Sequence, residues 1–430
     1  MDDADPVRGP RRAVEAEAGR GGPHAVVRRP RVLAFVLAGG KGERLYPLTE
    51  QRSKPAVPFG GKYRIVDFVL SNLVNSAIYA IYVLVQYKAQ SLIDHLRTAW
   101  RGGGIVPDHF VIVVPPQMRW TETWYQGTAD AVYQNRNLLA DFDPDVVAVF
   151  GADHVYRMDV SQMLTFHLAR RADVTVAALP VPIEEASGFG IMGVEADGRI
   201  VEWAEKPAEP FPLPDDPTRA LASMGNYLFD RQVLVDALVE DAQRGTDHDF
   251  GRNILPALVP ARRVFAYRFT ANVLPGLQPY EEPAYWRDVG TLAAYWQANM
   301  DLLGPQPRLD LANPRWPIFT ASYGGPPAQV IAGEVEDVLL GEGTRIDGAE
   351  VRRSILGRGV RVERGARVEE SLVMDHSVVS AGARLRRVIV DRYNVIPEGA
   401  VIGYRADEDA RRFFVDPAGL VVLPRGRTRR

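Results

Sequence analysis

The chain has 430 residues, of which 46% are hydrophobic and 24% charged, the balance of a globular protein large enough for two or three domains. The absence of cysteine excludes disulfides, thiolate zinc sites and cysteine nucleophiles, and it fits a reducing compartment. A formal net charge of −3 offers no positive field for nucleic acid, and no apolar run approaches the roughly 18 residues of a membrane span.

The first 30 residues mix aspartate, arginine, glycine and proline without the apolar core of a signal peptide. We interpret residues 1–30 as a disordered tail. We therefore expect a cytoplasmic protein.

The first strong structural signal is the apolar run Val32–Leu37, which ends in Gly39 and Gly40. Such a run is typical of a buried parallel strand that enters a tight loop. Similar runs alternate with helical patterns at Ala129–Leu139 and Val160–Arg171, so we expect an open α/β sheet with ligands at the carboxyl ends of its strands. The other predicted strands are 81–85, 111–114, 146–150 and 174–179.

The pattern changes after residue 303, where a linker rich in glycine and proline covers 304–327. Beyond it, over 328–430, apolar residues recur every six positions. This period is typical of a hexapeptide parallel β-helix, and we expect each row to stack along one interior edge. The apolar positions form three rows: 360, 366, 372 and 378; 362, 368 and 374; and 383, 389, 395 and 401. An irregular β-sandwich is the alternative to the β-helix. A short helix is predicted after the last coil, over Ala406–Phe414.

A glycine-rich segment, Leu37–Leu45, follows the first predicted strand. Glycines at such a place let backbone N–H groups approach a phosphate, and the nearby Lys41 would neutralise it. The segment is neither a Walker A loop nor a Rossmann fingerprint, and a purely structural turn is the alternative.

Further motifs follow in order: Arg52–Asp67, Trp124–Ala131, Gly151–His154, Glu205–Pro207, Ser223–Tyr227, His248–Gly251 and Tyr285–Thr291. With the glycine-rich segment, they resemble the glucose-1-phosphate adenylyltransferases (ADP-glucose pyrophosphorylases), a nucleotidyltransferase family. The resemblance runs from about residue 31 to the end.

The resemblance implies a Rossmann-like, GT-A-like α/β domain with a mixed sheet over 31–303, followed by a left-handed parallel β-helix. It also implies the activity: ATP and α-D-glucose 1-phosphate would give ADP-glucose and pyrophosphate, the committed step of bacterial glycogen or α-glucan synthesis. Members of the family with bacterial origin are homotetramers, so we expect one here.

Asp153 follows the predicted strand 146–150, so we expect its carboxylate at the carboxyl end of that strand, where it can hold Mg²⁺ against a triphosphate. The resemblance implies Asp288 as the second ligand. A turn or capping aspartate is the alternative for each. The attacking phosphate is already an anion, so no general base is required, and we interpret His154 as structural.

Two anionic substrates repel each other, and fixed cations have to offset that repulsion. Lys41, Arg44 and Lys54 are the candidates around the triphosphate, and we expect Arg44, Lys54 and Asp153 to be the catalytic residues. A solvated surface charge is the alternative for Arg44 and Lys54.

The resemblance also implies the substrate contacts. Gln117 would hydrogen-bond the adenine edge, and Lys206 would bind the phosphate of glucose 1-phosphate. Thr128 is open to a second interpretation as a helix N-cap, and Tyr227 and Phe250 are open to one as core. The expected ATP-binding residues are Leu37, Ala38, Gly39, Gly40, Lys41, Gln117, Tyr125, Gly127 and Thr128. Those expected for glucose 1-phosphate are Glu205, Lys206, Ser223, Asp249 and Trp286.

Regulation by phosphorylated metabolites, bound between the catalytic domain and the β-helix, is also implied. Arginine suits phosphate because its planar fork binds it bidentately, and surface arginine is the alternative. Gln51 and Pro58 replace a lysine and a histidine of enterobacterial relatives, so we expect a monophosphate such as fructose 6-phosphate or glucose 6-phosphate. The implied effector arginines are Arg52, Arg64, Arg392 and Arg425, with Gln86 and Trp124 coupling them to catalysis.

Other functions stay open. One is a pyrophosphorylase for another nucleoside triphosphate or sugar phosphate, and a second is a non-catalytic regulatory subunit. Retention of Arg44, Lys54, Asp153 and Lys206 argues against the second.

Overall fold

The computed structural model describes residues 29–100, 106–118 and 123–426. The expected N-terminal tail lies almost entirely outside these residues. The described chain divides into two compact units, each built from separate segments. Unit 1 takes the described residues of 1–35, 116–149 and 166–267, and unit 2 takes those of 36–115, 150–165 and 268–430. Among the described residues, no helix has the length and apolar character needed to cross a bilayer.

Unit 1 is built around antiparallel strands. The longest of these, β11, pairs with β8 and β9, and β9 pairs in turn with β10. The apolar stretch predicted at 174–179 forms the buried start of β8, and that at 146–150 forms β6. The strands are β6 (Val146–Gly151), β8 (Val174–Pro182), β9 (Gly190–Val194), β10 (Ile200–Glu205), β11 (Arg219–Asp230) and β12 (Val264–Arg268). The helices are α3 (Thr128–Tyr133), α4 (Arg136–Phe142), α6 (Arg231–Ala242), α7 (Leu255–Leu258), and the short turns η3 (Ile183–Gly188) and η4 (Phe250–Ile254).

The helix predicted over Ala129–Leu139 is two helices, α3 and α4. Asn135 interrupts them because its side-chain amide donates to the carbonyl of Ala131, at 2.8 Å, and its backbone N–H donates instead to Val132. Asparagine competes with the helical ladder in this way, so a pattern of apolar residues alone missed the break.

Unit 2 begins with the end of β1 (Val32–Ala38) and includes the parallel pair β4 (Ala80–Val85) and β5 (Phe110–Val114). The parallel β4–β5 pair, with the antiparallel pairs of unit 1, gives the mixed sheet expected from the sequence. The remaining elements before the β-helix are η1 (Glu43–Leu45), η2 (Lys54–Ala56), β2 (Pro58–Phe59), β3 (Tyr63–Arg64), α1 (Ile65–Asn75), α2 (Gln90–Ala99), β7 (His154–Tyr156), α5 (Val160–Ala169), η5 (Phe269–Ala271), β13 (Trp286–Asp288) and α8 (Leu292–Met300).

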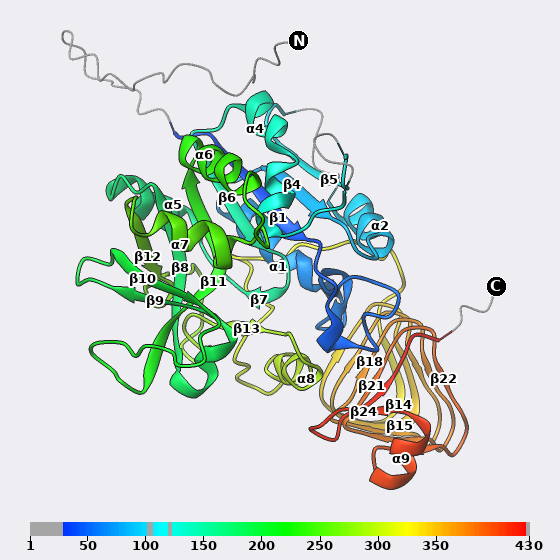
Figure 1. The fold of residues 1–430 in the computed structure, drawn as a ribbon. Coiled ribbons are helices and arrows are strands. Elements are labelled where there is room, and N and C mark those ends of the chain that lie inside the picture. The colour runs from blue at the N-terminus through cyan, green and yellow to red at the C-terminus, as the bar shows by residue number, and fades with distance from the viewer. Residues whose placement is uncertain (1–28, 101–105, 119–122, 427–430) are drawn as a thin grey trace. The chain divides into compact units, whose positions relative to one another are not determined.

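The C-terminal part of unit 2 is a parallel β-helix, whose stacked coils run from yellow β14 to red β25 in Figure 1. This confirms the β-helix prediction over the β-sandwich. The coils comprise β14 (Gln329–Leu340), β15 (Arg345–Leu356), β16 (Arg361–Val362), β17 (Arg367–Glu369), β18 (Leu372–Val373), β19 (Val378–Val379), β20 (Arg384–Arg386), β21 (Val388–Val390), β22 (Val395–Ile396) and β23 (Val401–Ile402), followed by α9 (Ala406–Arg412), β24 (Phe414–Val415) and β25 (Val421–Leu423).

The prediction that each six-residue row stacks along one edge is wrong. Ile355 pairs with Leu372, and Leu372 with Ile389, so one coil takes 17 residues. A step of six residues moves the chain to the next face of the coil and does not return it to the same edge. One step in each coil is therefore a residue shorter than a hexapeptide, and Val395 of the third row is 52% exposed.

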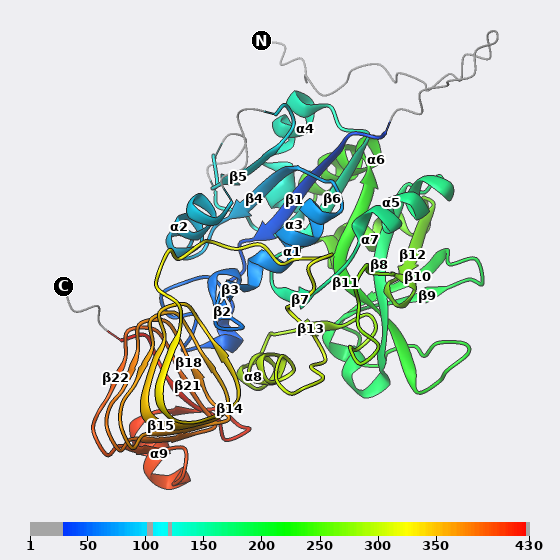
Figure 2. The same ribbon diagram turned by 180° about the vertical axis from the view of Figure 1, so that it is seen from behind.

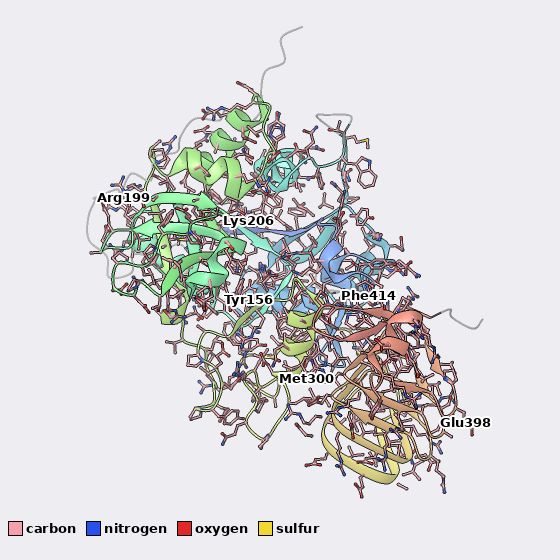
Figure 3. All side chains as sticks on the ribbon, turned by 60° about the horizontal axis from the view of Figure 1, so that its bottom comes forward. Tyr156, Arg199, Lys206, Met300, Glu398 and Phe414 are labelled. Atoms are coloured by element: carbon pink, nitrogen blue, oxygen red, sulfur yellow. The ribbon has the colours of Figure 1, made fainter. Side chains whose placement is uncertain are left out.

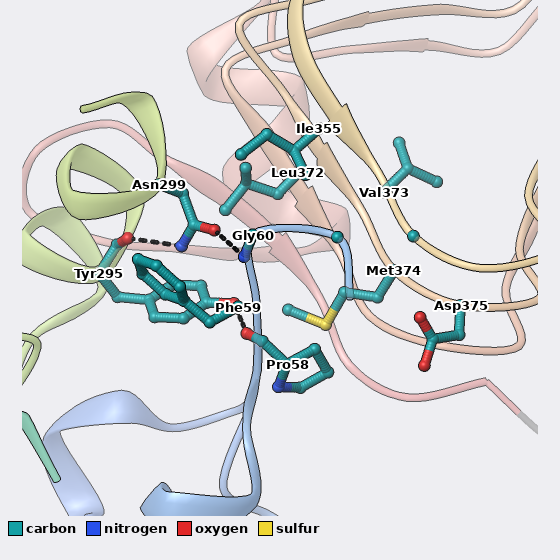
Figure 4. A pocket seen from close by; sticks show the side chains of 12 residues that line it. Pro58, Phe59, Gly60, Tyr295, Asn299, Ile355, Leu372, Val373, Met374 and Asp375 are labelled. Carbon is teal, nitrogen blue, oxygen red and sulfur yellow. Dashed lines mark hydrogen bonds between the residues drawn. The ribbon is translucent and has the colours of Figure 1, made fainter. Parts of the chain in front are cut away.

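Helix α8 packs beside the coils of the β-helix, as Figure 2 shows. The indole of Trp296 donates to the carbonyl of Glu370 at 2.9 Å. Between α8 and the β-helix lies a pocket. In it, Oδ1 of Asn299 accepts a hydrogen bond from the backbone N–H of Gly60 at 2.9 Å (Figure 4). The segment after the glycine-rich loop is therefore fixed to both α8 and the β-helix within unit 2.

Candidate active site

Lys54 is the centre of an ion-paired group in unit 2. Its Nζ lies 3.1 Å from Oδ2 of Asp153 and 3.0 Å from Oδ1 of Asp288, and its side chain is only 7% exposed. Burial disfavours the ammonium, but the two carboxylates outweigh burial and raise the pKa of Lys54. For Asp153, burial is likewise outweighed, by Lys54 and His154, which hold its pKa well below the usual range. Lys54 and Asp153 are therefore charged at neutral pH.

A short two-stranded sheet explains why residues so distant in sequence meet. Strand β13 pairs antiparallel with β7, so that Asp288 lies opposite His154 and Trp286 opposite Tyr156. Asp153 directly precedes β7 and thus reaches the same end of the pair as Asp288. The indole of the buried Trp286 packs against the His154 ring, with centroids 5.0 Å apart.

The same carboxylates fit a divalent metal ion. Ligand atoms of Asp153, His154 and Asp288 all lie within 4.8 Å of one another. Carboxylate oxygens are the ligands that Mg²⁺ prefers, and the side chains of Asp153 and Asp288 are 42% and 23% exposed, which leaves them accessible to an ion with bound waters. The sequence suggests a structural role for His154, and only the strand pairing reveals that its Nε2 lies 4.0 Å from Oδ1 of Asp288.

The glycine-rich segment approaches this group closely. Gly42 adopts φ 65°, and a Cβ there would lie 3.0 Å from the Cβ of Lys54, so both the backbone conformation and the space require glycine. Arg44 extends into solvent, 73% exposed, with its guanidinium 4.0 Å from Asp288. Lys41 is also exposed, and its Nζ lies 3.8 Å from Oε1 of Glu43.

The glycine-rich segment begins inside β1. Leu37 and Ala38 are the last two residues of that strand, and Gly39 follows it. A Cβ on Gly39 would meet Gln86 at 3.4 Å, so Gln86 lies at the glycine turn. The predicted coupling role of Gln86 would therefore act at the glycine-rich segment.

The second set of predicted site residues lies in unit 1. A Cβ on Gly127 would lie 2.2 Å from the carbonyl oxygens of both Asp247 and His248, so only glycine permits this approach. The interpretation of Thr128 as N-cap is wrong, because Gly127 holds that position and Thr128 is the first helical residue. Its hydroxyl instead donates to Asp249 at 2.9 Å and accepts from the N–H of Phe250 at 3.0 Å.

Asp249 caps the turn η4, accepting from the N–H groups of Gly251 and Arg252 at 2.9 and 3.0 Å. A carboxylate offers about four acceptor sites. The bonds from Gly251, Arg252 and Thr128 use three of them. One acceptor direction is left for a sugar hydroxyl, so the capping role and the predicted role are compatible.

Glu205, at the end of β10, is wedged between two glycines. A Cβ on Gly251 would lie 2.4 Å from its Oε2, and a Cβ on Gly190 2.7 Å from it. Burial raises the pKa of Glu205, assisted by Asp249 and opposed by Lys206. Lys206, labelled in Figure 3, is half exposed and adopts φ 50°, with its Nζ 3.4 Å from Glu205.

Ser223 lies at an irregularity of β11, where the register with β8 shifts before Tyr227. Gly225 within it adopts φ 70° and donates its N–H to the Ser223 hydroxyl at 3.1 Å. Such bulges redirect side chains at functional sites. Tyr227 and Phe250 are buried, with ring centroids 5.8 Å apart, as their interpretation as core residues requires.

Three predicted residues of the 116–126 region are also in unit 1. Tyr125 is buried and accepts a hydrogen bond from Asn135 at 2.8 Å, and burial raises its pKa. Gln117 and Trp124 are exposed. Trp124 therefore belongs to a different unit from the four arginines with which it was predicted to act.

Those arginines gather in unit 2, where the β-helix meets the start of α1. Arg52 is fully buried and paired with Asp391, and the Arg64 guanidinium lies 3.8 Å from Asp375. Burial and the charges of Arg64 and Arg52 lower the pKa of Arg392 to about 9. Arg425 lies over the Tyr393 ring at 5.2 Å. Nη1 of Arg52 and Nε of Arg392 are buried and have no hydrogen-bond partner among the described residues.

Comparisons with known proteins agree with this geometry. Residues 33–304 match the model of the Nucleotidyl transferase family, whose members typically use a divalent metal ion, and residues 326–423 match the GlmU-like C-terminal hexapeptide model. The glucose-1-phosphate adenylyltransferase of Thermodesulfovibrio yellowstonii is 51% identical over 92% of this chain and 96% of its own length. Proteins of the same name from Anaeromyxobacter sp. and Thermus thermophilus are each 49% identical over 92% of this chain and 98% of their own. The chain belongs to the glucose-1-phosphate adenylyltransferase family of nucleotidyltransferases.

Proposed function

We propose that the chain transfers the adenylyl group of ATP to α-D-glucose 1-phosphate, giving ADP-glucose and pyrophosphate. The observation that carries the proposal is the ion-paired group of Lys54, Asp153 and Asp288, in a chain whose relatives are named for this reaction. Such a reaction brings two polyanions together, and a positioned lysine beside two carboxylates that can hold a divalent ion suits that task.

The attacking atom is a phosphate oxygen of glucose 1-phosphate. It forms a bond to the α-phosphorus of ATP while the bond from that phosphorus to the bridging oxygen of the β-phosphate breaks. The electron pair leaves with pyrophosphate. The nucleophile is already an anion, so no proton has to be removed and no general base is needed.

The work of this chain is then to position the substrates and to offset their charge. Lys54 provides a cation held in place by its two carboxylates, while the exposed Arg44 and Lys41 are free to close on the triphosphate. A Mg²⁺ ion would be held by Asp153 and Asp288, and when bound it would neutralise further negative charge on the phosphates.

Substrate binding is assigned to two groups of residues. Glu205, Ser223 and Asp249 would form hydrogen bonds with the sugar hydroxyls. Lys206 would bind the phosphate of glucose 1-phosphate, and Trp286 would pack against the apolar face of the sugar. For ATP we assign Leu37, Ala38, Gly39, Gly40, Lys41, Gln117, Tyr125, Gly127 and Thr128.

The test is pyrophosphate release by the purified full chain with ATP and Mg²⁺, comparing glucose 1-phosphate with other sugar phosphates. We expect glucose 1-phosphate and ATP to be preferred. If another nucleoside triphosphate is used tenfold better, the proposed substrate is wrong. If no pair of substrates reacts while effectors bind, the chain is a regulatory subunit.

We also propose that a sugar monophosphate regulates the enzyme through Arg52, Arg64, Arg392 and Arg425. The buried, unpartnered guanidinium nitrogens of Arg52 and Arg392 support this proposal. Fructose 6-phosphate or glucose 6-phosphate should alter the rate of the wild type and lose this effect in Arg392→Gln. The surface variant Arg411→Gln should respond like the wild type.

The remaining assignments follow the family. We propose a catalytic domain over 31–303, a linker over 304–327 and a β-helix domain over 328–430. We further propose a cytoplasmic homotetramer that supplies ADP-glucose for glycogen or α-glucan synthesis, and size-exclusion chromatography with light scattering tests the assembly.

A further inference from the structure

Three polar side chains are joined at the end of α6, in unit 1. The Nδ1–H of His248 donates to Oδ2 of the buried Asp241 at 2.7 Å. The Thr246 hydroxyl donates to Oδ1 of the same carboxylate at 2.9 Å and accepts the backbone N–H of His248 at 3.1 Å. His248 is therefore held by its ring and by its own backbone at once.

This network fixes a backbone conformation that a histidine seldom adopts. His248 has φ 51°, in the left-handed region, which is unfavourable for a non-glycine residue and persists only when its surroundings hold it there. The bonds to Asp241 and Thr246 are those surroundings. The strained residue directly precedes Asp249, the residue proposed to bind the sugar.

The conformation of His248 also fixes the start of α3. Its carbonyl oxygen accepts the N–H of Ala129 at 2.7 Å and that of Asp130 at 3.3 Å, two groups that a helix leaves without a helical partner. The same carbonyl is one of the two that a Cβ on Gly127 would strike. The amides of Ala129 and Asp130 are thus occupied by the carbonyl of His248 and are not available to a substrate phosphate.

A second bond joins the same two segments. The Thr128 hydroxyl donates to Asp249, which itself caps the next turn. The turn at Gly127–Thr128 and the carboxylate of Asp249 therefore form one body, whose anchor is the pair Asp241–His248.

We propose that His248 is a positioning residue that holds the ATP-binding turn and the sugar-binding Asp249 in register. The inference rests on the proposed function, which assigns those two segments to the two substrates. His248 acts through the backbone and through Asp249, and its ring nitrogen Nδ1 is committed to Asp241.

Steady-state kinetics of His248→Ala and His248→Asn test the proposal. Asparagine tolerates the left-handed region, and its Nδ2 stands where Nδ1 of histidine stands, so it keeps the donor to Asp241. We expect about a tenfold rise in KM for both ATP and glucose 1-phosphate in His248→Ala, with kcat within about threefold, and rescue to within about threefold in His248→Asn. The control His109→Ala, at a half-buried position of unit 2, should match the wild type.

A merely structural role would give a different result. It would lower kcat in proportion to the folded fraction, measured by circular dichroism, and leave both KM values unchanged, which would overturn the proposal. A rise in KM for one substrate alone would also overturn it. The double variant Asp241→Ala with His248→Ala should have KM values within about twofold of those of His248→Ala, because Asp241 acts through His248.

Hydrogen exchange separates this inference from the proposed function. In the ligand-free chain, the peptide containing the amides of Ala129 and Asp130 should exchange at least about tenfold faster in His248→Ala and at the wild-type rate in His248→Asn. If the wild type makes no ADP-glucose, the proposed function fails, and this exchange still decides whether His248 holds α3. Unchanged exchange in His248→Ala overturns the inference even in an active enzyme.

Discussion

The Nζ of Lys54 lies 3.0 Å from Oδ1 of Asp288, a residue 234 positions later in the chain. With Asp153 on its other side, this ammonium is enclosed by two carboxylates and nearly removed from solvent. This holds the ammonium in place at the point where we propose that the two anionic substrates meet. Substitutions at these positions that remove a charge and keep the size of the side chain should therefore lower activity without unfolding the protein.

Asp153→Asn should abolish turnover while leaving the fold intact. The amide keeps the size of the carboxylate but removes a charge that pairs with Lys54 and would hold a metal ion. Pyrophosphate release and circular dichroism measure the two effects. The exposed Asp407→Asn on α9 serves as the control, and near-normal activity in Asp153→Asn would remove this residue from the site.

Lys54→Met should lower kcat by about 10²–10³, the usual cost of removing one preorganised charge-stabilising group. It also leaves Asp153 and Asp288 without the cation between them, so their repulsion should be relieved by a bound ion. We expect saturating Mg²⁺ to raise the thermal midpoint of this variant more than that of the wild type. Lys62→Met, a more exposed lysine, is the control. Equal Mg²⁺ shifts in all three proteins would contradict the ion-pair interpretation.

Gly127→Ala should destabilise the protein by about 1–3 kcal/mol, because its Cβ would overlap two carbonyl oxygens at 2.2 Å. It should also weaken binding of both substrates. Gly245→Ala is a matched control in the neighbouring loop, where a Cβ would meet nothing within 4 Å. Chemical denaturation measures both variants, and a similar cost at the two glycines would show that the close approach is not essential.

Stability should fall in acid partly through His167, which is buried and 2.8 Å from the Thr175 hydroxyl. Burial lowers its pKa to about 4, against about 6.5 in an unfolded chain, although Asp230 and Asp173 oppose the shift. Between these values only the unfolded chain binds the proton, so the free energy of unfolding should drop as pH falls from about 6.5 to 4, by up to about 3 kcal/mol.

The variant His167→Gln isolates this contribution. Its neutral amide does not titrate, so its free energy of unfolding should change less than that of the wild type over the same pH range. Denaturant titrations at several pH values measure the difference. His109→Gln, at a half-buried position of unit 2, should follow the wild type, and identical slopes for His167→Gln and wild type would refute the assignment.

Local sequence patterns predicted most of the fold. Val32–Leu37 and 146–150 are continuous apolar runs, and each forms a buried strand whose bounds shift by one residue at most. Patterns failed where a longer-range contact intervened. Asn135 breaks a helix through its own side chain, and the coil of 17 residues depends on how successive turns stack.

The sequence by itself determined the family, the order of the motifs and the chemistry that each residue type offers. Asp153 after its strand and Gly42 in its loop were found from neighbours in the chain alone, and Lys206 through the resemblance to the family. Only the tertiary structure decided which of them meet. Pairing of β7 with β13 brings His154 and Asp288 together, and the carbonyl of His248 reaches α3, because strand register and backbone hydrogen bonds act between segments that no local pattern relates.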